Sequence, residues 1–261
     1  MSSYKKLCTE FYDLDKPEAP EDALTFYLRL ADRTNGPILE PMCGSGRFLI
    51  PLLERGFDIE GVDASSHMLR ACRASCEKKA LTPVLHEQSV EQMDLSRKYG
   101  LVFIPAGSFC LIIEPKQAED CLKRIYDFML PHARFVLEVE TPRAQPAHVG
   151  QWGGRWVERP DGSKILLSWL GLYDEKEQIC RAINRYELFK AGALLKTELE
   201  EFTLRFHEAA EFRSLLETAG FENIRVFKPY QPCEPDWSDP SIVFECHKPS
   251  RSTAWKVRQT L

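Results

Sequence analysis

The chain has 261 residues with 44% hydrophobic content, which is enough for one substantial core but too little for two full domains. Its net charge of −5 argues against a protein that works mainly on a polyanion, so we expect no nucleic-acid partner. No apolar run approaches the ~20 residues of a membrane-spanning helix, and nine cysteines without regular spacing indicate reduced thiols, so we expect a cytoplasmic protein without membrane contact.

Residues 1–36 carry apolar and aromatic side chains among charged ones, which indicates one or two helices. We expect this segment to lie against the main domain as a lid.

From residue 37 the chain alternates short apolar runs with helical patterns. The predicted strands are 38–41, 58–63, 83–87, 101–105 and 134–140, and the predicted helices are 45–55, 65–79 and 116–129. Pro51 is expected to bend the first of these helices, because it removes a backbone hydrogen bond. The alternation predicts a parallel sheet with helices on both faces.

Residues 142–207 follow a different pattern. Asp161-Gly162 is a strong hairpin signal, and two further alternating runs are joined around Gly192. We expect an inserted antiparallel meander of about four strands. A helix over 208–219 and strands near 222–227 and 241–247 then complete the domain formed by 37–141 and 208–248, and 249–261 form a tail.

The segment 37–63 predicts a nucleotide-binding unit, since it gives a strand, a glycine turn, a helix and a second strand that ends in an acid. Gly44 and Gly46 let the backbone approach a ligand closely. Asp63, at the end of the second strand, can accept both hydrogen bonds of a ribose diol. Its structural alternative is to cap the next helix at Ser65.

Two residues distinguish between the cofactors that such a unit binds. Glu40 ends the first strand and suits a ligand that carries an ammonium and a sulfonium rather than two phosphates; its structural alternative is a pair with a nearby arginine. Leu49 stands where a dinucleotide site needs its third glycine. Both residues weigh against a dinucleotide.

The run Glu40-Pro-Met-Cys-Gly-Ser-Gly46, with Asp63 after it, resembles the class I S-adenosylmethionine-dependent methyltransferases. The likeness covers most of the chain and points to the small-molecule branch with glycine, sarcosine and amino-sugar N-methyltransferases. It implies a Rossmann-like, seven-stranded, mostly parallel sheet, S-adenosyl-L-methionine as cofactor and S-adenosyl-L-homocysteine as product. Met42 departs from the family's first glycine, and Ser89 from an acid often found there.

The resemblance also implies which residues bind the cofactor. They are Tyr12, Glu40, Met42, Cys43, Gly44, Ser45, Gly46, Arg47, Asp63, Ala64, Met68, Ser89, Val90, Glu91, Pro105, Ala106, Gly107 and Ser108.

The methyl acceptor is expected to be a small molecule with an N or O nucleophile. Methyl transfer from a sulfonium is an in-line displacement, so an amine needs positioning rather than a strong base, and we favour an amine. A hydroxyl acceptor would need a base, for which His148 and Glu140 are the candidates. The candidate substrate residues of the meander are Trp152, Arg155, Trp169, Tyr173 and Arg185.

Other possibilities stay open. The aromatic residues of the meander also suit a homodimer interface. We expect no metal, because no four ligands show the spacing of a zinc site. A non-enzymatic domain that binds S-adenosylmethionine or S-adenosylhomocysteine, and a less favoured NAD(P)-dependent reductase, are the alternatives to an enzyme that transfers methyl groups.

Overall fold

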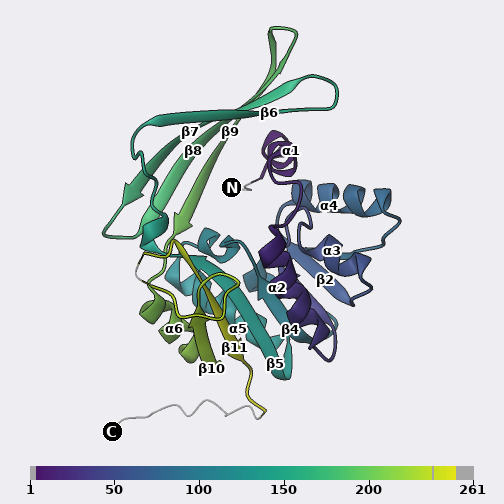
Figure 1. The fold of residues 1–261 in the computed structure, drawn as a ribbon, viewed down its shortest axis with the longest axis vertical. Coiled ribbons are helices and arrows are strands. Elements are labelled where there is room, and N and C mark those ends of the chain that lie inside the picture. Colours follow the sequence, from purple (N-terminus) through teal and green to yellow (C-terminus); the bar gives the residue numbers. More distant parts are fainter. Residues whose placement is uncertain (1–3, 237, 251–261) are drawn as a thin grey trace.

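The computed structural model describes residues 4–236 and 238–250. Its centre is a seven-stranded sheet in the order β10-β11-β5-β4-β1-β2-β3 (Figure 1). The strands are β1 (Ile38–Pro41), β2 (Ile59–Asp63), β3 (Val84–Glu87), β4 (Tyr99–Ile104), β5 (Met129–Glu140), β10 (Glu222–Phe227) and β11 (Ser241–His247). Only β11 runs antiparallel to its neighbours, which confirms the predicted mostly parallel sheet.

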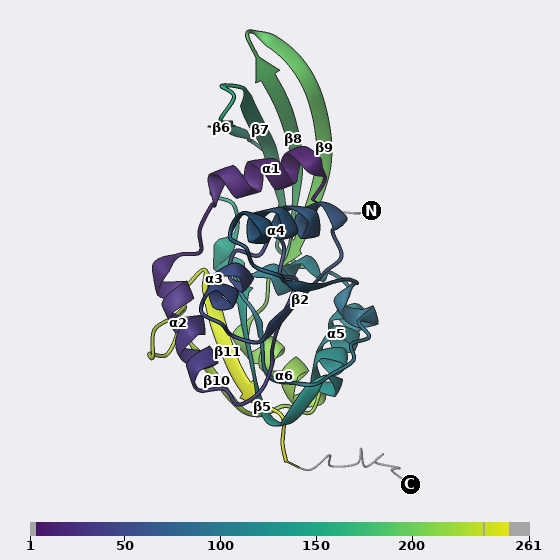
Figure 2. The same cartoon turned by 90° about the vertical axis from the view of Figure 1, so that its right-hand side faces the viewer.

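Helices cover both faces of this sheet (Figures 1 and 2). One face carries α2 (Glu21–Asp32), α3 (Leu49–Glu54) and α4 (Ser66–Lys78), and the other carries α5 (Pro115–Asp127) and α6 (Ala209–Thr218). Along β4, Leu101 and Phe103 pack in the core between the sheet and the layer of α2, α3 and α4. Val102 and Ile104 pack in the core on the opposite face, under α5 and α6. This alternation explains why β4 is almost entirely apolar, since a strand covered on both faces has no side open to water.

The helix predicted over 45–55 is shorter in the structure, where α3 begins only at Leu49. Gly44 and Gly46 have φ values of 56° and 86°, so the turn is left-handed and the helix cannot begin within it. Pro51 then lies in the first helical turn, where its missing N–H costs no bond within α3. The expectation that Pro51 bends this helix is therefore wrong.

The inserted meander is a separate four-stranded antiparallel sheet, as predicted, and it extends away from the main sheet (Figure 1). Its strands are β6 (Trp152–Glu158), β7 (Lys164–Asp174), β8 (Ile179–Lys190) and β9 (Ala193–Arg205). Helix α1 (Lys6–Asp15) lies between this sheet and α4 in both views. Leu7 and Phe11 of α1 pack with Ile165 and Tyr186 of the meander. The first helix thus fills the space between the two sheets, whereas α2 belongs to the layer on the main sheet.

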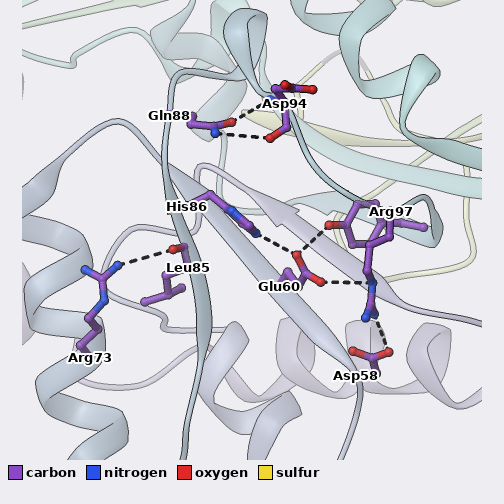
Figure 3. Close-up of polar contacts among 9 residues, drawn as sticks. Asp58, Glu60, Arg73, Leu85, His86, Gln88, Asp94 and Arg97 are labelled. Atoms are coloured by element: carbon purple, nitrogen blue, oxygen red, sulfur yellow. Dashed lines mark hydrogen bonds and ion pairs between the residues drawn. The ribbon is translucent and has the colours of Figure 1, made fainter.

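A buried carboxylate ties together the strands at one edge of the main sheet (Figure 3). Glu60 of β2 accepts hydrogen bonds of 2.8 Å from the Tyr99 hydroxyl and, by its Oε2 atom, from His86 Nε2. Arg97 Nε lies 3.1 Å from Glu60 Oε1 as an ion pair, and Arg97 also pairs with Asp58. Because a buried carboxylate needs such partners, the cluster fixes β2 against β3 and β4.

Two negative observations apply to the described parts of the chain. None of their helices is both long and apolar enough to cross a membrane. Within the same residues, no three His, Cys, Asp or Glu side chains are placed so that they could hold a metal ion. The predicted tail falls mostly in residues 251–261, outside the described residues.

Candidate functional site

A cavity of about 960 Å³ lies at the carboxyl ends of β1 to β4. The turns that follow these strands form its floor, which is where ligands bind in open α/β sheets. Tyr4, Lys5 and Tyr12 form a second wall, and a third is formed by Ile183 of β8 with Leu199, Glu200, Glu201 and Thr203 of β9. The cavity is therefore enclosed by three parts of the chain that are distant in the sequence.

Asp63 connects the turns after β1 and β2. Its Oδ2 atom accepts a 2.8 Å hydrogen bond from the Gly44 amide, and its Oδ1 atom accepts one of 2.7 Å from the Ser65 amide. Burial raises the pKa of Asp63, and these two amides oppose that rise. Each carboxylate oxygen can accept more than one bond, so Asp63 both shapes the turn and keeps capacity for a pair of ligand hydroxyls.

Glu40 presents a buried carboxylate to the same cavity. The residue is 2% exposed, and its Oε2 atom has no hydrogen-bond partner among the described residues. Burial raises the pKa of Glu40 well above its ordinary value, and the positive charge of Arg47 opposes this shift. A buried carboxylate without a partner is unfavourable unless a cation or donor meets it. A cofactor with an ammonium group fits this requirement.

Arg47 and Tyr12 close the cavity beside Glu40. The guanidinium carbon of Arg47 lies 5.6 Å from the centre of the Tyr12 ring and 5.5 Å from that of Phe48. Such distances allow cation–π attraction. Burial is the main cause that raises the pKa of the Tyr12 hydroxyl, so the ring stays neutral. Helix α1 thereby places an aromatic cover against the glycine turn.

Met42 has the backbone conformation of a glycine. Its φ is 59°, in the left-handed region that side chains disfavour, and its side chain packs against the core while lining the cavity. Met42 thus holds a backbone conformation that glycine adopts more readily than any residue with a side chain.

The turn after β3 is fixed by side chains. Gln88 Oε1 accepts a 2.8 Å hydrogen bond from the Asp94 amide, and Gln88 Nε2 donates to the Asp94 carbonyl at 3.4 Å (Figure 3). Gln117 of α5 donates to Glu91 Oε1 at 3.0 Å. Ser89 and Val90 lie between these clamps and face the cavity, so the site presents a rigid polar edge there.

Hydrogen bonds to Glu138 of β5 fix the turn after β4. Glu138 accepts hydrogen bonds from the Ala106 amide at 3.0 Å and the Ser241 hydroxyl at 2.8 Å, and from the Tyr230 hydroxyl. Ala106 and Gly107 have φ values of 55° and 68°. The buried carboxylate supports a left-handed turn that brings Pro105, Ala106 and Ser108 to the cavity wall.

Most of the predicted cofactor residues lie on this cavity. Those on its wall are Tyr12, Glu40, Met42, Cys43, Gly44, Arg47, Asp63, Ala64, Met68, Ser89, Val90, Glu91, Pro105, Ala106 and Ser108. Ser45, Gly46 and Gly107 are not on the wall, although they belong to the same turns. A Cβ atom at Gly46 would lie 2.5 Å from Cys72 Sγ, so this glycine permits the close packing of the turn on α4.

The predicted base and substrate residues lie elsewhere. His148 is exposed, Glu140 lies beneath Gly107, and neither is on the cavity wall. The five candidate substrate residues, Trp152, Arg155, Trp169, Tyr173 and Arg185, are not on the wall either. Arg155 pairs with Asp15 of α1 at 2.8 Å, and Trp169 packs in the cluster around α1.

Sequence reasoning missed the third wall and part of the second, which residues 4, 5 and 12 form. The residues on the wall that it did not name as contacts are Tyr4, Lys5, Phe48, Ser65, Gln88, Leu111, Ile112, Ile113, Gln117, Ile183, Leu199, Glu200, Glu201 and Thr203. Period-two alternation in β9 could have grouped Leu199, Glu201 and Thr203 on one face. It could not have shown that this face meets the cavity.

The comparisons with known proteins point to a methyltransferase. Residues 38–132 match the family model described as a methyltransferase domain. A Geobacillus protein with a provisional methyltransferase name is 25% identical over 136 residues, which cover 50% of this chain and 55% of that protein. The Bacillus subtilis protein YqeM, with the same kind of name, is 23% identical over 91% of this chain and 94% of its own. The chain thus spans about half of the first relative and nearly all of the second.

Solved structures share the whole fold. An S-adenosylmethionine-dependent methyltransferase from Clostridium acetobutylicum has a TM-score of 0.78 at 15% identity, covering 94% of this chain and 98% of that one. The sugar N-methyltransferase KedS8 from Streptoalloteichus has a TM-score of 0.73 at 18% identity, covering 95% and 97%. At such identities the likeness concerns the fold, and with the family model it confirms the resemblance drawn from the sequence.

Proposed function

Since the chain carries the methyltransferase domain and the fold of the S-adenosylmethionine-dependent family, we propose that it transfers a methyl group from S-adenosylmethionine to a small molecule, with an amine as the favoured acceptor. One observation supports the cofactor above all: the unpartnered, buried carboxylate of Glu40 faces the same cavity as Asp63. An ammonium group and a ribose diol on one ligand would satisfy both acids. The volume of about 960 Å³ lies within the range of small-molecule sites.

The residues of the floor have separate binding roles in this proposal. Asp63 holds the ribose hydroxyls, Glu40 the ammonium, and Arg47 the carboxylate of the methionine end. The turn at Ser89 and Val90 borders the adenine, with Met68 packing on its face. The predicted contacts of Ser45, Gly46 and Gly107 would be made by backbone or through their support of these turns.

When bound, the cofactor would supply a methyl group on a positively charged sulfur, which is open to in-line displacement. The chain's own residues would align the acceptor and keep water away from it, which are the main contributions that such a reaction needs. Tyr12 of α1 and Tyr4, two residues before α1, cover the cavity, and Leu111, Ile112 and Ile113 give it an apolar side. These residues would exclude water without taking part in proton transfer.

The acceptor is proposed to lie against β8 and β9. Ile183, Leu199 and Thr203 line the cavity there, together with the exposed Glu201. An apolar wall with an exposed acid suits an amine with an apolar body. The five substrate residues predicted from the meander would then act as support for α1 or as outer surface rather than as contacts.

The outer face of the meander supports a homodimer. Trp152, Trp156 and Leu172 are 59%, 54% and 43% exposed, and they lie on one face of the sheet. Apolar side chains gathered in this way are typical of an interface. Sedimentation of the wild-type chain and of Trp152→Arg should give a dimer and a monomer; a wild-type monomer at micromolar concentration would exclude this assembly.

Activity tests separate the proposed enzyme from its alternatives. Transfer of labelled methyl from S-adenosylmethionine should occur to some members of panels of amines, and less to carboxylates or phenols. Binding of S-adenosylhomocysteine with no transfer to any panel would favour the non-enzymatic domain. Binding of NADH in its place would favour the reductase, against which Leu49 already argues.

A further inference from the structure

Glu200 of β9 lies where the meander, the start of α1 and the cavity meet. The residue is 5% exposed, and it is on the cavity wall. Its Oε2 atom accepts a 2.8 Å hydrogen bond from the Tyr4 amide, and its Oε1 atom accepts one of 2.6 Å from the Lys5 amide. Both oxygens of one carboxylate therefore hold two successive residues of the lid.

The bond from the Lys5 amide satisfies a donor that the start of a helix leaves without a partner, whereas the Tyr4 amide lies just before the helix. Helix α1 begins at Lys6, and its N-cap residue Lys5 makes no side-chain cap bond. The first amides of a helix need outside acceptors, and negative charge is favoured near them. Glu198, two residues before Glu200 on the same strand, accepts a 2.6 Å bond from the Leu7 amide. β9 thus caps α1 with two carboxylates.

Tyr4, which Glu200 holds, is linked by hydrogen bonds to Asp63, the acid that we assign to the ribose. The Tyr4 carbonyl accepts a 3.1 Å hydrogen bond from the Ser65 hydroxyl, and the Ser65 amide is bonded to Asp63 Oδ1. Tyr4 also has a φ of 63°, and its ring meets Phe202 edge-on at 5.0 Å. A continuous set of hydrogen bonds therefore joins Glu200, through Tyr4 and Ser65, to Asp63.

We propose that Glu200 is a positioning residue that holds residues 4 and 5 over the cofactor end of the cavity and so slows the release of the bound cofactor. The inference rests on the proposed function, because it takes the ligand beside Asp63 to be S-adenosylmethionine or its product. Glu198 bonds α1 in the same way but is not on the cavity wall. Glu200 accepts two amides and Glu198 accepts one while it also pairs with Lys196 at 2.6 Å, so both acids support the start of α1 and only Glu200 does so from the cavity wall.

The test compares Glu200→Gln with Glu198→Gln in the full chain. The probe is S-adenosylhomocysteine, whose dissociation constant is measured by titration and whose release rate is measured with labelled ligand and an unlabelled chase. A glutamine can accept through one oxygen only, so Glu200→Gln loses one charged bond to the lid. We expect release to become about tenfold faster in Glu200→Gln and to change less than about threefold in Glu198→Gln. Melting temperatures without ligand should fall in both variants.

The readouts separate the positioning role from a merely structural one. Hydrogen exchange at the amides of residues 4 and 5 should rise in Glu200→Gln with ligand bound, and Glu200→Asp, which keeps the charge but is too short to reach both amides, should also release the ligand faster. Equal release rates in Glu200→Gln and the wild type, or equal changes in both glutamine variants, would overturn the inference alone. A wild-type chain that binds no S-adenosylhomocysteine would overturn the proposed function and this role together.

Discussion

The carboxylate of Asp63 lies 2.8 Å from the backbone nitrogen of Gly44, so the acid that ends β2 holds the glycine turn that follows β1. The same carboxylate accepts the Ser65 amide at the start of α4. Asp63 is thus a structural residue as well as a candidate ligand contact, and a substitution there should affect stability and binding together.

Asp63→Ala removes both of these charged acceptors. We expect the free energy of unfolding to fall by about 2 kcal/mol or more, since hydrogen bonds to charged groups contribute roughly 1.5–3 kcal/mol each. The affinity for S-adenosylhomocysteine should fall by more than about tenfold. Denaturant unfolding and calorimetric titration measure the two effects.

Asp63→Asn is the matched control for this substitution. It retains one acceptor for the turn, so it should unfold at a denaturant concentration between those of the wild type and Asp63→Ala. If Asp63→Ala kept full affinity for S-adenosylhomocysteine, the ribose assignment would be wrong.

Glu40→Gln should stabilise the free protein and weaken cofactor binding. The buried charge has no full set of partners, so its removal should raise the free energy of unfolding by roughly 1–3 kcal/mol. The same change removes the partner that we assign to the cofactor's ammonium. Glu201→Gln, an exposed acid on the same cavity, is the control and should leave S-adenosylhomocysteine affinity unchanged.

The pH dependence of Glu40 has a defined sign. Its pKa in the folded chain is raised by burial, so the folded state keeps a proton that the unfolded chain has lost. Its contribution to stability therefore decreases as the pH rises from the ordinary carboxyl pKa through the raised one. Cofactor affinity should change in the opposite direction, weakening as the pH falls, because the ammonium pairs with the charged form. A Glu40→Gln variant with the same pH profile as the wild type would refute both statements.

The strands and the cofactor turns could be predicted from the sequence because their signals are local. Glu40, Gly44 and Asp63 stand at the ends of apolar runs, and parallel strands bring such ends to one edge of a sheet. The start of α3 was mispredicted because a helical pattern does not show that Gly46 has a left-handed φ.

The acceptor wall could not be predicted in the same way. Glu200 and Glu201 come from β9, more than a hundred residues after Asp63, and only the pairing of β8 with β9 and the packing of α1 bring them to the cavity. Neighbouring meander residues alternate between two faces, so clustering in sequence grouped Trp152 and Arg155, which lie on opposite faces. The sequence around Tyr4 and Lys5 has no pattern that predicts their place at the cavity, because this place depends on hydrogen bonds to the distant carboxylate of Glu200.

Met42 offers a test of backbone strain in the glycine turn. A residue other than glycine in the left-handed region costs roughly 1–2 kcal/mol, and Met42 offsets this cost by packing against the core. Met42→Ala should lose the packing and keep the strain, whereas Met42→Gly loses the packing and relieves the strain. We therefore expect the glycine variant to be the more stable of the two by about 1 kcal/mol in denaturant unfolding. The reverse order would show that the turn is not left-handed at this residue in solution.

His207 should make the protein sensitive to acid. Its ring is 2% exposed, its Nε2 atom has no partner within the described residues, and burial lowers its pKa from 6.5 to about 4. The unfolded chain takes up a proton first, so stability is lost as the pH falls from 6.5 towards 4, by up to about 3 kcal/mol. His207→Phe, which can pack against Phe109 and Phe212, should lose less stability over this interval. Parallel slopes for the two proteins would contradict a buried neutral imidazole.

The most direct test of the cofactor assignment is the thermal unfolding of the full chain with S-adenosylhomocysteine or NADH. Ligand at 100 times its dissociation constant stabilises a native state by ~2.7 kcal/mol, so S-adenosylhomocysteine should raise the melting temperature of the wild type, with a smaller rise in Glu40→Gln and Asp63→Ala. NADH should leave it unchanged. An unchanged melting temperature with S-adenosylhomocysteine at millimolar concentration, or a rise with NADH alone, would contradict the assignment of this cavity to S-adenosylmethionine.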